Sequence, residues 1–245
     1  MSTPVRVLLL GAKGRMGQAI VAAAPKAEVE ITAGLDLGDE IAKQIDRCDV
    51  VIDFSHPNAS SELSSACRDA KKPAVIGTTG HSKEERVAIE ELARSVPVVL
   101  SPNFSVGVNA LFWLTRKAAE LLGDDFDLEI TEMHHRLKKD APSGTAKKLA
   151  EILCEVRQLD YAKNVRHGRE GLIGERPAKE IGVHSIRGGD VVGDHNVSFA
   201  GAGERLELSH KAASRETFAL GALRAASWIV GKPPRLYSME DVLGL

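Results

Sequence analysis

Ionisable side chains gather ahead of a predicted helix in the stretch TEMHHRLKKDAPSGTAKKLA. His134 and His135 are adjacent, and Arg136 and Lys138 follow them directly. A histidine can take up or release a proton near neutral pH, and a lysine supplies a positive charge or a proton. This pattern is typical either of a solvated basic loop or of a site that handles an anion.

The turn that follows favours the second interpretation. Ser143 can cap a helix, and the first amides of that helix, at Gly144 and Thr145, form an anion site. Lys138 and Arg136 lie close to this helix start in the sequence. The segment therefore predicts a site that binds a small dicarboxylate substrate and moves a proton.

A metal site is a weaker interpretation of the same segment. Adjacent residues on an extended chain point to opposite sides, so His134 and His135 do not chelate one ion in the usual way. The three cysteines, Cys48, Cys67 and Cys154, are far apart and form no CxxC pair. We expect no metal, no disulfide framework and a reducing compartment.

A glycine-rich loop follows the first apolar run. In LLLGAKGRMGQAI, Gly11, Gly14 and Gly17 come directly after a predicted strand and open a helix. Such glycines allow a tight turn and bring backbone amides close to a pyrophosphate. The spacing is GxxGxxG rather than the commoner GxGxxG, so a plain tight turn stays open as an alternative. Asp36 ends the second strand about 20 residues on, where an acid can bind ribose hydroxyls, and it favours a dinucleotide site.

Two more loops leave the carboxyl ends of predicted strands, where open α/β sheets bind ligands. One holds Gly77, Thr78 and Thr79, and the other holds Ser101, Pro102, Asn103 and Phe104. Small polar residues are also what ordinary turns use. Because both loops end strands of one sheet, we interpret them as cofactor-facing.

The composition excludes several classes of function. The chain has 245 residues, 43% hydrophobic and 27% charged, with a formal net charge of −2. A chain this balanced has no general basic field to hold nucleic acid or anionic lipid. The apolar run before Gly11 is too short for a signal peptide or a membrane span. We expect a cytoplasmic protein with no nucleic-acid or membrane partner.

The first hundred residues predict a parallel, doubly wound sheet. Short runs of Val, Ile and Leu alternate with helical patterns, as in βαβ units buried on both faces. Pro57 suits a first helical position, and Ser82 with Glu85 makes a capping box. The predicted strands are 5–10, 30–35, 50–54, 73–77 and 97–100.

The second half lacks the βαβ rhythm and predicts an α+β domain with a mixed sheet. Residues 160–180 read as a long surface loop, and the turn RGGD joins the first two of three late strands. The expected elements are helices at 106–122 and 144–157, a strand near 126–132, and strands at 181–187, 191–200 and 204–211. A final apolar helix near 215–230 must be buried, and we expect it against the first domain. The predicted domains are 1–104 with 215–245 for the dinucleotide, and 105–214 for substrate binding and oligomerisation.

Taken together, these motifs resemble the dihydrodipicolinate reductase family, also called 4-hydroxy-tetrahydrodipicolinate reductases. The resemblance runs through nearly the whole chain, from GAKGRMG through VVIDFSHP, GTTG, SPNFSVGVN and EMHHRLKKDAPSGTA to GDVVGDHNVSFAGAGERLELSHKAASRETFALGA. It implies reduction by NADH or NADPH of 4-hydroxy-2,3,4,5-tetrahydrodipicolinate to tetrahydrodipicolinate in lysine and diaminopimelate synthesis. It also implies a cytoplasmic homotetramer.

The resemblance assigns roles to particular positions. His134 falls at the acid/base position and Lys138 at the proton-donor position, while His135, Gly144 and Thr145 fall at substrate-binding positions. We also expect Ser143, the predicted cap beside them, to be a substrate-binding residue. The cofactor positions are Gly11, Ala12, Lys13, Gly14, Arg15, Met16, Asp36, Gly77, Thr78, Thr79, Ser101, Pro102, Asn103 and Phe104.

Two departures and two alternatives remain. Leu137 stands where many relatives carry histidine, and Leu37 stands where some place an arginine for a 2′-phosphate. A non-catalytic NAD(H) sensor would share the first domain but would not need the segment from His134 to Thr145. Another nicotinamide dehydrogenase would carry different residues in the second domain. Turnover of the substrate separates these classes.

Overall fold

A computed structural model describes residues 3–245, and the chain forms two compact units. The first unit comprises the residues up to Val106 together with Arg215–Leu245, and the second comprises Gly107–Ser214. Each unit has its own sheet and its own buried core.

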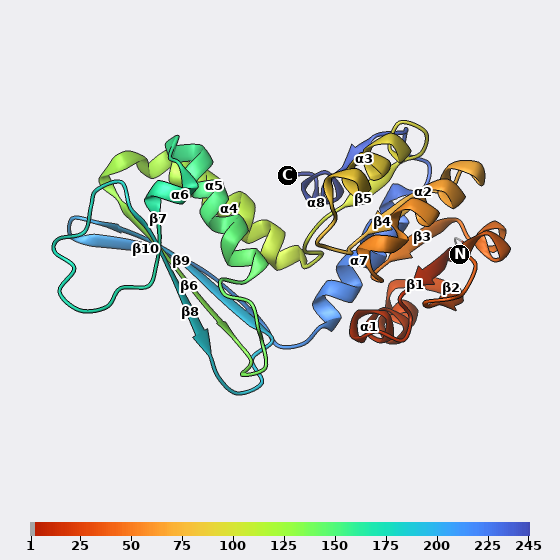
Figure 1. The fold of residues 1–245 in the computed structure, drawn as a ribbon, viewed down its shortest axis with the longest axis horizontal. Helices are drawn as coiled ribbons and strands as arrows, with labels where there is room; N and C mark the ends of the chain where they lie inside the picture. Colours follow the sequence, from red (N-terminus) through yellow and green to blue (C-terminus); the bar gives the residue numbers. More distant parts are fainter. Residues whose placement is uncertain (1–2) are drawn as a thin grey trace. The chain divides into compact units, whose positions relative to one another are not determined.

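The first unit contains a six-stranded sheet in which every pairing is parallel, in the order β11-β5-β4-β3-β1-β2 (Figure 1). Its strands are β1 (Val5–Leu10), β2 (Val29–Leu35), β3 (Val50–Asp53), β4 (Ala74–Ile76), β5 (Val98–Leu100) and β11 (Leu236–Tyr237). The chain moves outward in one direction from β1 to β2 and in the other from β3 onward. The carboxyl ends of β1 and β3 therefore flank the switch point where such sheets bind ligands.

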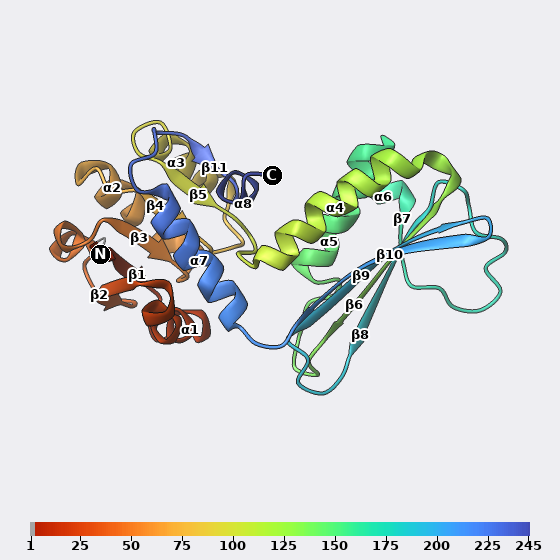
Figure 2. The ribbon, with the colours of Figure 1, turned by 180° about the vertical axis from the view of Figure 1, so that it is seen from behind.

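Helices cover both faces of this sheet. On one face α1 (Arg15–Ala23), α7 (Glu216–Ile229) and α8 (Met239–Leu243) contribute to a core that contains Ile20, Leu223 and Val242. On the other, α2 (Ser60–Asp69) and α3 (Lys83–Leu92) bury Leu63 and Ile89. Figure 2 shows α7 beside α1, in agreement with their contacts. The continuous Val, Ile and Leu runs of the strands are explained by this double coverage.

The helix starts follow the predicted signals. Pro57 opens a 3₁₀ turn, Pro57–Ala59, that leads into α2. Ser82 and Glu85 form the predicted capping box of α3, with Ser82 Oγ accepting from the Glu85 amide at 3.2 Å. The remaining 3₁₀ turns are Ala24–Ala27, Ile41–Lys43, Ile45–Arg47 and Gly123–Asp125.

The second unit contains a five-stranded mixed sheet in the order β10-β9-β6-β8-β7. Its strands are β6 (Asp127–His134), β7 (Val165–His167), β8 (Ile181–Arg187), β9 (Gly193–Gly201) and β10 (Glu204–Ala212). Residues from α4 (Val106–Leu122) and α5 (Gly144–Arg157) form a core with Ile130, Val183 and Val197 of the sheet. Because alternate residues of β6 and β9 are buried, one face of the sheet is covered.

The predicted fold class, a Rossmann-like parallel sheet with an α+β domain, is confirmed, but two local expectations are wrong. The turn RGGD connects β8 to β9, as predicted, yet the two strands are not neighbours in the sheet, because β6 lies between them, parallel to β8 and antiparallel to β9. Residues 160–180 are not all loop, since α6 (Tyr161–Asn164) and β7 occupy part of them. The strand predicted near 126–132 continues to His134, so this histidine belongs to β6. The sequence reading also missed β11 and α8.

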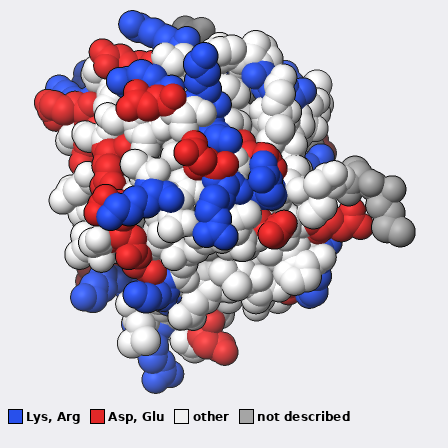
Figure 3. Space-filling model, turned by 90° about the vertical axis from the view of Figure 1, so that its right-hand side faces the viewer, with Lys and Arg blue, Asp and Glu red and all other residues white. Residues whose placement is uncertain are grey.

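Positive and negative side chains alternate on the face drawn in Figure 3, and neither sign dominates it. None of the helices within residues 3–245 combines the length and the apolar character needed to cross a membrane.

Candidate cofactor and substrate sites

The glycine loop is shaped by close backbone contacts. Gly11 has φ +80°, and a Cβ at this position would lie 2.4 Å from the carbonyl oxygen of Phe54. A Cβ on Gly17 would lie 2.1 Å from the carbonyl oxygen of Gly11. Gly14 is the N-cap of α1 and has no side chain to fill the space ahead of the first free amides. Only glycine meets the first two demands, and the helix start is left open to a phosphate.

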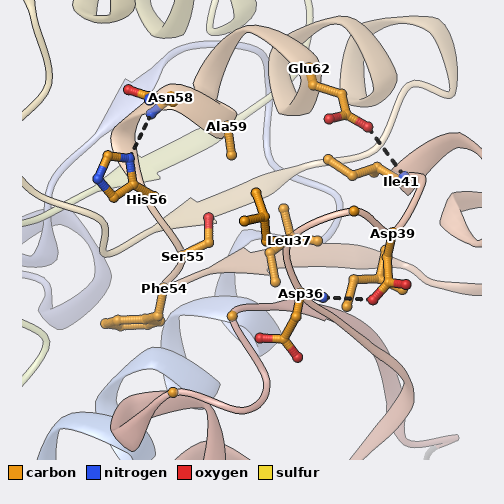
Figure 4. A pocket seen from close by; sticks show the side chains of 15 residues that line it. Asp36, Leu37, Asp39, Ile41, Phe54, Ser55, His56, Asn58, Ala59 and Glu62 are labelled. Atoms are coloured by element: carbon orange, nitrogen blue, oxygen red, sulfur yellow. Dashed lines mark hydrogen bonds between the residues drawn. The ribbon is translucent and has the colours of Figure 1, made fainter.

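A pocket of about 630 Å³ lies beside this loop at the carboxyl ends of β1, β2 and β3 (Figure 4). Three carboxylates line it: Asp36 and Asp39 from the chain after β2, and Glu62 from α2. The other lining residues are Leu10, Gly11, Gly14, Leu35, Leu37, Gly38, Ile41, Phe54, Ser55, His56, Asn58 and Ala59. Apolar walls beside the glycine loop and an acidic end suit the adenosine half of a dinucleotide.

The Asp36 side chain contacts the glycine loop directly. Both of its carboxylate oxygens lie 3.2 Å from the backbone nitrogen of Lys13. Its own amide donates to Asp39 Oδ2 at 2.9 Å. Leu37 is fully exposed, and Lys13 and Arg15 are exposed on the loop. The predicted acid therefore stands at the pocket, where it also holds the loop in place.

The two later loops end β4 and β5, as predicted. Gly77 packs under the Phe54 ring, since a Cβ there would come within 2.3 Å of it, and Thr78 is buried while Thr79 is exposed. In the other loop Ser101 Oγ donates to the carbonyl of Asn103 at 2.7 Å, and Phe104 meets Phe54 edge to face at 5.6 Å. Of the predicted cofactor residues, Gly11, Gly14 and Asp36 line the pocket itself. Pro102 is exposed, and Ala12 and Met16 are partly buried.

The sequence reading missed the contribution of β3. Phe54, Ser55, His56 and Asn58 line the pocket, and the Asn58 amide donates to His56 Nδ1 at 3.4 Å. Asp53 is fully buried at the end of β3; burial raises its carboxyl pKa, although hydrogen bonds from Ser55 act in the opposite direction. The motif VVIDFSHP could have indicated these residues, because it places them directly after a predicted strand.

In the second unit, His134 is held by a buried carboxylate. His134 Nδ1 lies 2.6 Å from Glu132 Oε2, and the side chain of Glu132 is fully buried. Arg187 donates to both carboxylate oxygens at 2.8 Å. Burial by itself would raise the pKa of Glu132, but the hydrogen bonds from His134 and Arg187 hold it well below its usual value. Glu132 is therefore an ionised acceptor in this site.

The predicted helix cap is present. Ser143 is the N-cap of α5, and its Oγ accepts from the Ala146 amide at 3.2 Å. The Ser143 amide itself donates to Glu132 Oε1 at 3.2 Å. Gly144 is exposed and Thr145 is partly exposed, so the first turn of α5 is open to a ligand.

A second histidine, His195 on β9, completes the cluster. Its Nε2 lies 3.1 Å from Ser143 Oγ, and its ring meets the His134 ring edge to face at 5.2 Å. Desolvation is the main cause that lowers the pKa of His195 to about 3. The neutral ring can accept the hydroxyl proton of Ser143, whose oxygen already accepts from Ala146.

The remaining predicted residues surround this cluster. Lys138 Nζ forms an ion pair with Asp140 Oδ1 at 3.0 Å, and the lysine side chain is mostly covered. His135 is partly exposed, and Arg136 is exposed. Glu132, Arg187 and His195 were missed, because the first lies on the strand before the histidines and the other two come from segments far along the chain. No group of three or more His, Cys, Asp or Glu within residues 3–245 has the geometry of a metal site.

Family models match both parts of the chain. The model described as dihydrodipicolinate reductase, N-terminus, matches residues 5–104, and the model described as dihydrodipicolinate reductase, C-terminus, matches residues 107–243.

Curated relatives carry the corresponding name. A 4-hydroxy-tetrahydrodipicolinate reductase of Akkermansia muciniphila is 57% identical over 242 residues, which is 98% of each chain. One from Geobacter metallireducens is 46% identical over 264 residues, covering 98% of this chain and 99% of its own. Among solved structures, a dipicolinate-bound dihydrodipicolinate reductase from Paenisporosarcina sp. TG-14 matches with a TM-score of 0.78 and 28% identity, covering 96% of this chain and 97% of that one.

Proposed function

Because this chain belongs to the dihydrodipicolinate reductase family, we infer that it reduces 4-hydroxy-2,3,4,5-tetrahydrodipicolinate to tetrahydrodipicolinate, with loss of water and at the expense of NADH or NADPH. This reaction belongs to lysine and diaminopimelate synthesis. The observation that carries the inference is 57% identity to a curated reductase over 98% of both chains. This identity agrees with the resemblance that the sequence motifs carry.

The first unit binds the nicotinamide cofactor. The pocket of about 630 Å³ takes the adenosine, with Asp36 at its acidic end for the ribose hydroxyls. The open amides at the start of α1 and the close turn at Gly11 receive the pyrophosphate. The loops at Gly77–Thr79 and Ser101–Phe104 end neighbouring strands at the same edge and bound the remaining cofactor site. When bound, the cofactor supplies a hydride.

The second unit binds the dicarboxylate. A substrate carboxylate accepts hydrogen bonds from the amides of Gly144 and Thr145 at the first turn of α5, where the helix dipole favours negative charge. His135 lies beside them and contributes a polar contact to the substrate. Ser143 caps the helix and thereby orients these amides.

The proton is handled by His134 and Lys138. Hydride arrival at one carbon leaves negative charge on the substrate, and a cation with a proton donor must neutralise it. Lys138 supplies that proton from a largely covered ammonium group. His134 acts as the acid/base group, because its Nδ1 is engaged by Glu132 while its Nε2 is left for the substrate.

We also propose a homotetramer in the cytoplasm. The face of the mixed sheet opposite its core carries partly exposed residues of β6 and β9. Contacts between copies through this unit would cover them. The free thiols Cys48, Cys67 and Cys154 are buried and suit a reducing compartment. Light scattering coupled to size exclusion measures the mass: a monomer at micromolar concentration would reject the tetramer.

The decisive experiment follows NADH absorbance with enzymatically generated 4-hydroxy-tetrahydrodipicolinate. Turnover with this substrate tests cofactor, substrate and reaction class together. A protein that binds NADH without oxidising it would be a sensor, and one that turns over another carbonyl or imine better would be a different dehydrogenase.

A planar dicarboxylate tests the anion site separately. Pyridine-2,6-dicarboxylate should inhibit in competition with the substrate, because the amides at the start of α5 bind its carboxylates. Noncompetitive inhibition, or none at millimolar concentration, would contradict this placement.

A further inference from the structure

We propose that Glu132 is a positioning residue of the reductase: it fixes the His134 ring through Nδ1 and ties that ring to the start of α5, so that Nε2 meets the substrate. This inference rests on the proposed function for the role of His134 and of the α5 amides. It assigns to Glu132 a part in the reaction without contact to substrate or cofactor.

The hydrogen bonds to the Glu132 carboxylate use all of its acceptor sites. Its carboxylate receives His134 Nδ1 at 2.6 Å, the Ser143 amide at 3.2 Å, and two guanidinium nitrogens of Arg187 at 2.8 Å each. The Ser185 side chain also hydrogen-bonds to it. An ionised carboxylate only accepts hydrogen bonds and has about four such sites. Its contact with Nδ1 therefore requires a proton on that nitrogen, which leaves Nε2 as the atom of the ring that faces other chemistry.

Arg187 clamps this arrangement from β8. Besides the two bonds to Glu132, its Nη2 donates to the carbonyl of Asp140 at 2.7 Å. The arginine thus joins the end of β8 to the loop that carries Lys138 and leads into α5. Glu132 and Arg187 therefore fix three parts relative to one another. These are the acid/base histidine, the loop that carries Lys138, and the start of α5.

The space at Nε2 is kept open by a glycine. An ideal Cβ built on Gly193 would lie 2.9 Å from His134 Nε2. A side chain there would crowd the nitrogen that Glu132 leaves available. Because Gly193 does not have a positive φ, this requirement is steric and concerns the histidine, not the backbone conformation.

The same strand offers a matched comparison. Glu129, three residues earlier on β6, also binds a histidine, His184, and it binds two arginines, Arg169 and Arg176, where Glu132 binds one. Its side chain is 25% exposed, whereas that of Glu132 is fully buried. The partners of Glu129 lie outside the proposed site, so a Glu-to-Gln change at each position separates loss of a strand ion pair from loss of the His134 contact.

The experiment compares Glu132→Gln with Glu129→Gln. A glutamine at 132 keeps the shape but presents a donor at one end, and it faces the donors of Arg187 in either orientation. We expect kcat to fall by about 10²-fold in E132Q, similar to the 10- to 100-fold loss when the carboxylate partner of a metal-bound histidine is removed, and by less than about threefold in E129Q. The dissociation constant for NADH, measured by fluorescence, should stay unchanged in both.

The state of the ring is read directly from 15N magic-angle-spinning spectra of histidine-labelled, ligand-free protein, assigned by difference with His134→Gln. We expect a protonated Nδ1 in the wild type and in E129Q, and a changed signal in E132Q. A bare Nδ1 in the wild type would overturn the proposal, and so would a folded E132Q with kcat close to wild type. This readout needs no substrate, so it stands apart from failure of the proposed reaction.

If E132Q does not fold, Gly193→Ala replaces it. The added methyl group crowds Nε2 while Glu132, Arg187 and the Ser143 amide are unchanged, so kcat should fall about tenfold or more with Nδ1 still protonated. A G193A protein with unchanged kcat would show that substrate does not meet Nε2.

Discussion

The candidate sites of the two units depend on different parts of the chain: backbone atoms in the first unit and polar side chains in the second. In the first unit, Gly11 lies so close to the Phe54 backbone, and Gly17 so close to the Gly11 backbone, that a side chain at either position is excluded. In the second unit, a carboxylate on β6, an arginine on β8, a histidine on β9 and the capping serine of α5 meet in one buried network. The glycine loop of the first site depends on the absence of side chains, whereas the second site depends on a network of charged and polar ones.

This difference decides how each site fails. A backbone site is damaged by added volume, because a new methyl group must displace main-chain atoms. A side-chain network is damaged when one member loses its charge or its hydrogen bond, because the partners are then left buried and unsatisfied. Added volume should therefore act mainly on the glycine loop of the first unit, and isosteric polar changes mainly on the network of the second, where Gly193 is a steric exception.

The largest expected effect is in the second unit. His134→Gln and Lys138→Ala should each reduce turnover by roughly 10² to 10⁴, the usual contribution of a positioned proton carrier, or about 3 to 5 kcal/mol of barrier. Steady-state kinetics at saturating substrate measure it, with NADH affinity as the control. Near-normal turnover of the Lys138 variant would show that the proton comes from elsewhere.

A steric change in the first unit should come next. Gly17→Ala would place a Cβ 2.1 Å from the Gly11 carbonyl oxygen, so the loop must shift. We expect a loss of about 1 to 3 kcal/mol of stability, the typical cost of overpacking, with weakened NADH binding. Thermal unfolding and NADH titration measure both quantities. The control is Val21→Ala on the exposed side of the same helix; equal behaviour of the two variants would contradict the close-contact argument.

The stability of the protein should depend on pH through His195, which belongs to the network of the second unit. The pKa of His195 is lowered to about 3 in the folded protein from 6.5. Between these values the unfolded chain binds a proton that the folded chain does not, so stability decreases as pH falls below 6.5, by at most about 1.4 kcal/mol per pH unit. Denaturant unfolding at pH 7, 6 and 5 should show a steeper loss for the wild type than for His195→Gln. Parallel slopes would mean that His195 is not held neutral.

The smallest expected effect concerns the choice of cofactor. Asp36 and Asp39 line the pocket and Leu37 is fully exposed beside them, so a 2′-phosphate meets negative charge there. The exposed Lys13 and Arg15 can offset part of this repulsion, and we expect both cofactors to be used with a modest preference for NADH.

Leu37→Arg should shift the ratio of kcat/KM toward NADPH by roughly tenfold, about 1.4 kcal/mol from one charge-assisted contact. Initial rates with each cofactor at low and high salt measure it, because an exposed contact is screened. A wild type that prefers NADPH more than tenfold would overturn the role given to Asp36.

Much of the fold could be predicted because it rests on local patterns. The runs VRVLLL and VVID are apolar on both faces, which is typical of buried parallel strands, and the Ser82–Glu85 box marks a helix start by direct hydrogen bonds. The turn RGGD joins β8 to β9, but a turn signal reports only that two strands are near in sequence and not that they pair. The strand β6, from fifty residues earlier, inserts between them, and no local pattern encodes that insertion.

The features of the candidate sites also divide into those that local sequence patterns predict and those that tertiary contacts create. The sequence by itself determined the glycine loop, the acid at the end of β2 and the capped start of α5, because each depends on residues only a few positions apart or on the regular spacing of a βαβ unit. Only the tertiary structure decided that Glu132 receives Arg187, that His195 lies against Ser143, and that Gly193 leaves room at His134 Nε2. Those contacts join separate strands, and the partners meet only after the mixed sheet has set its order and register.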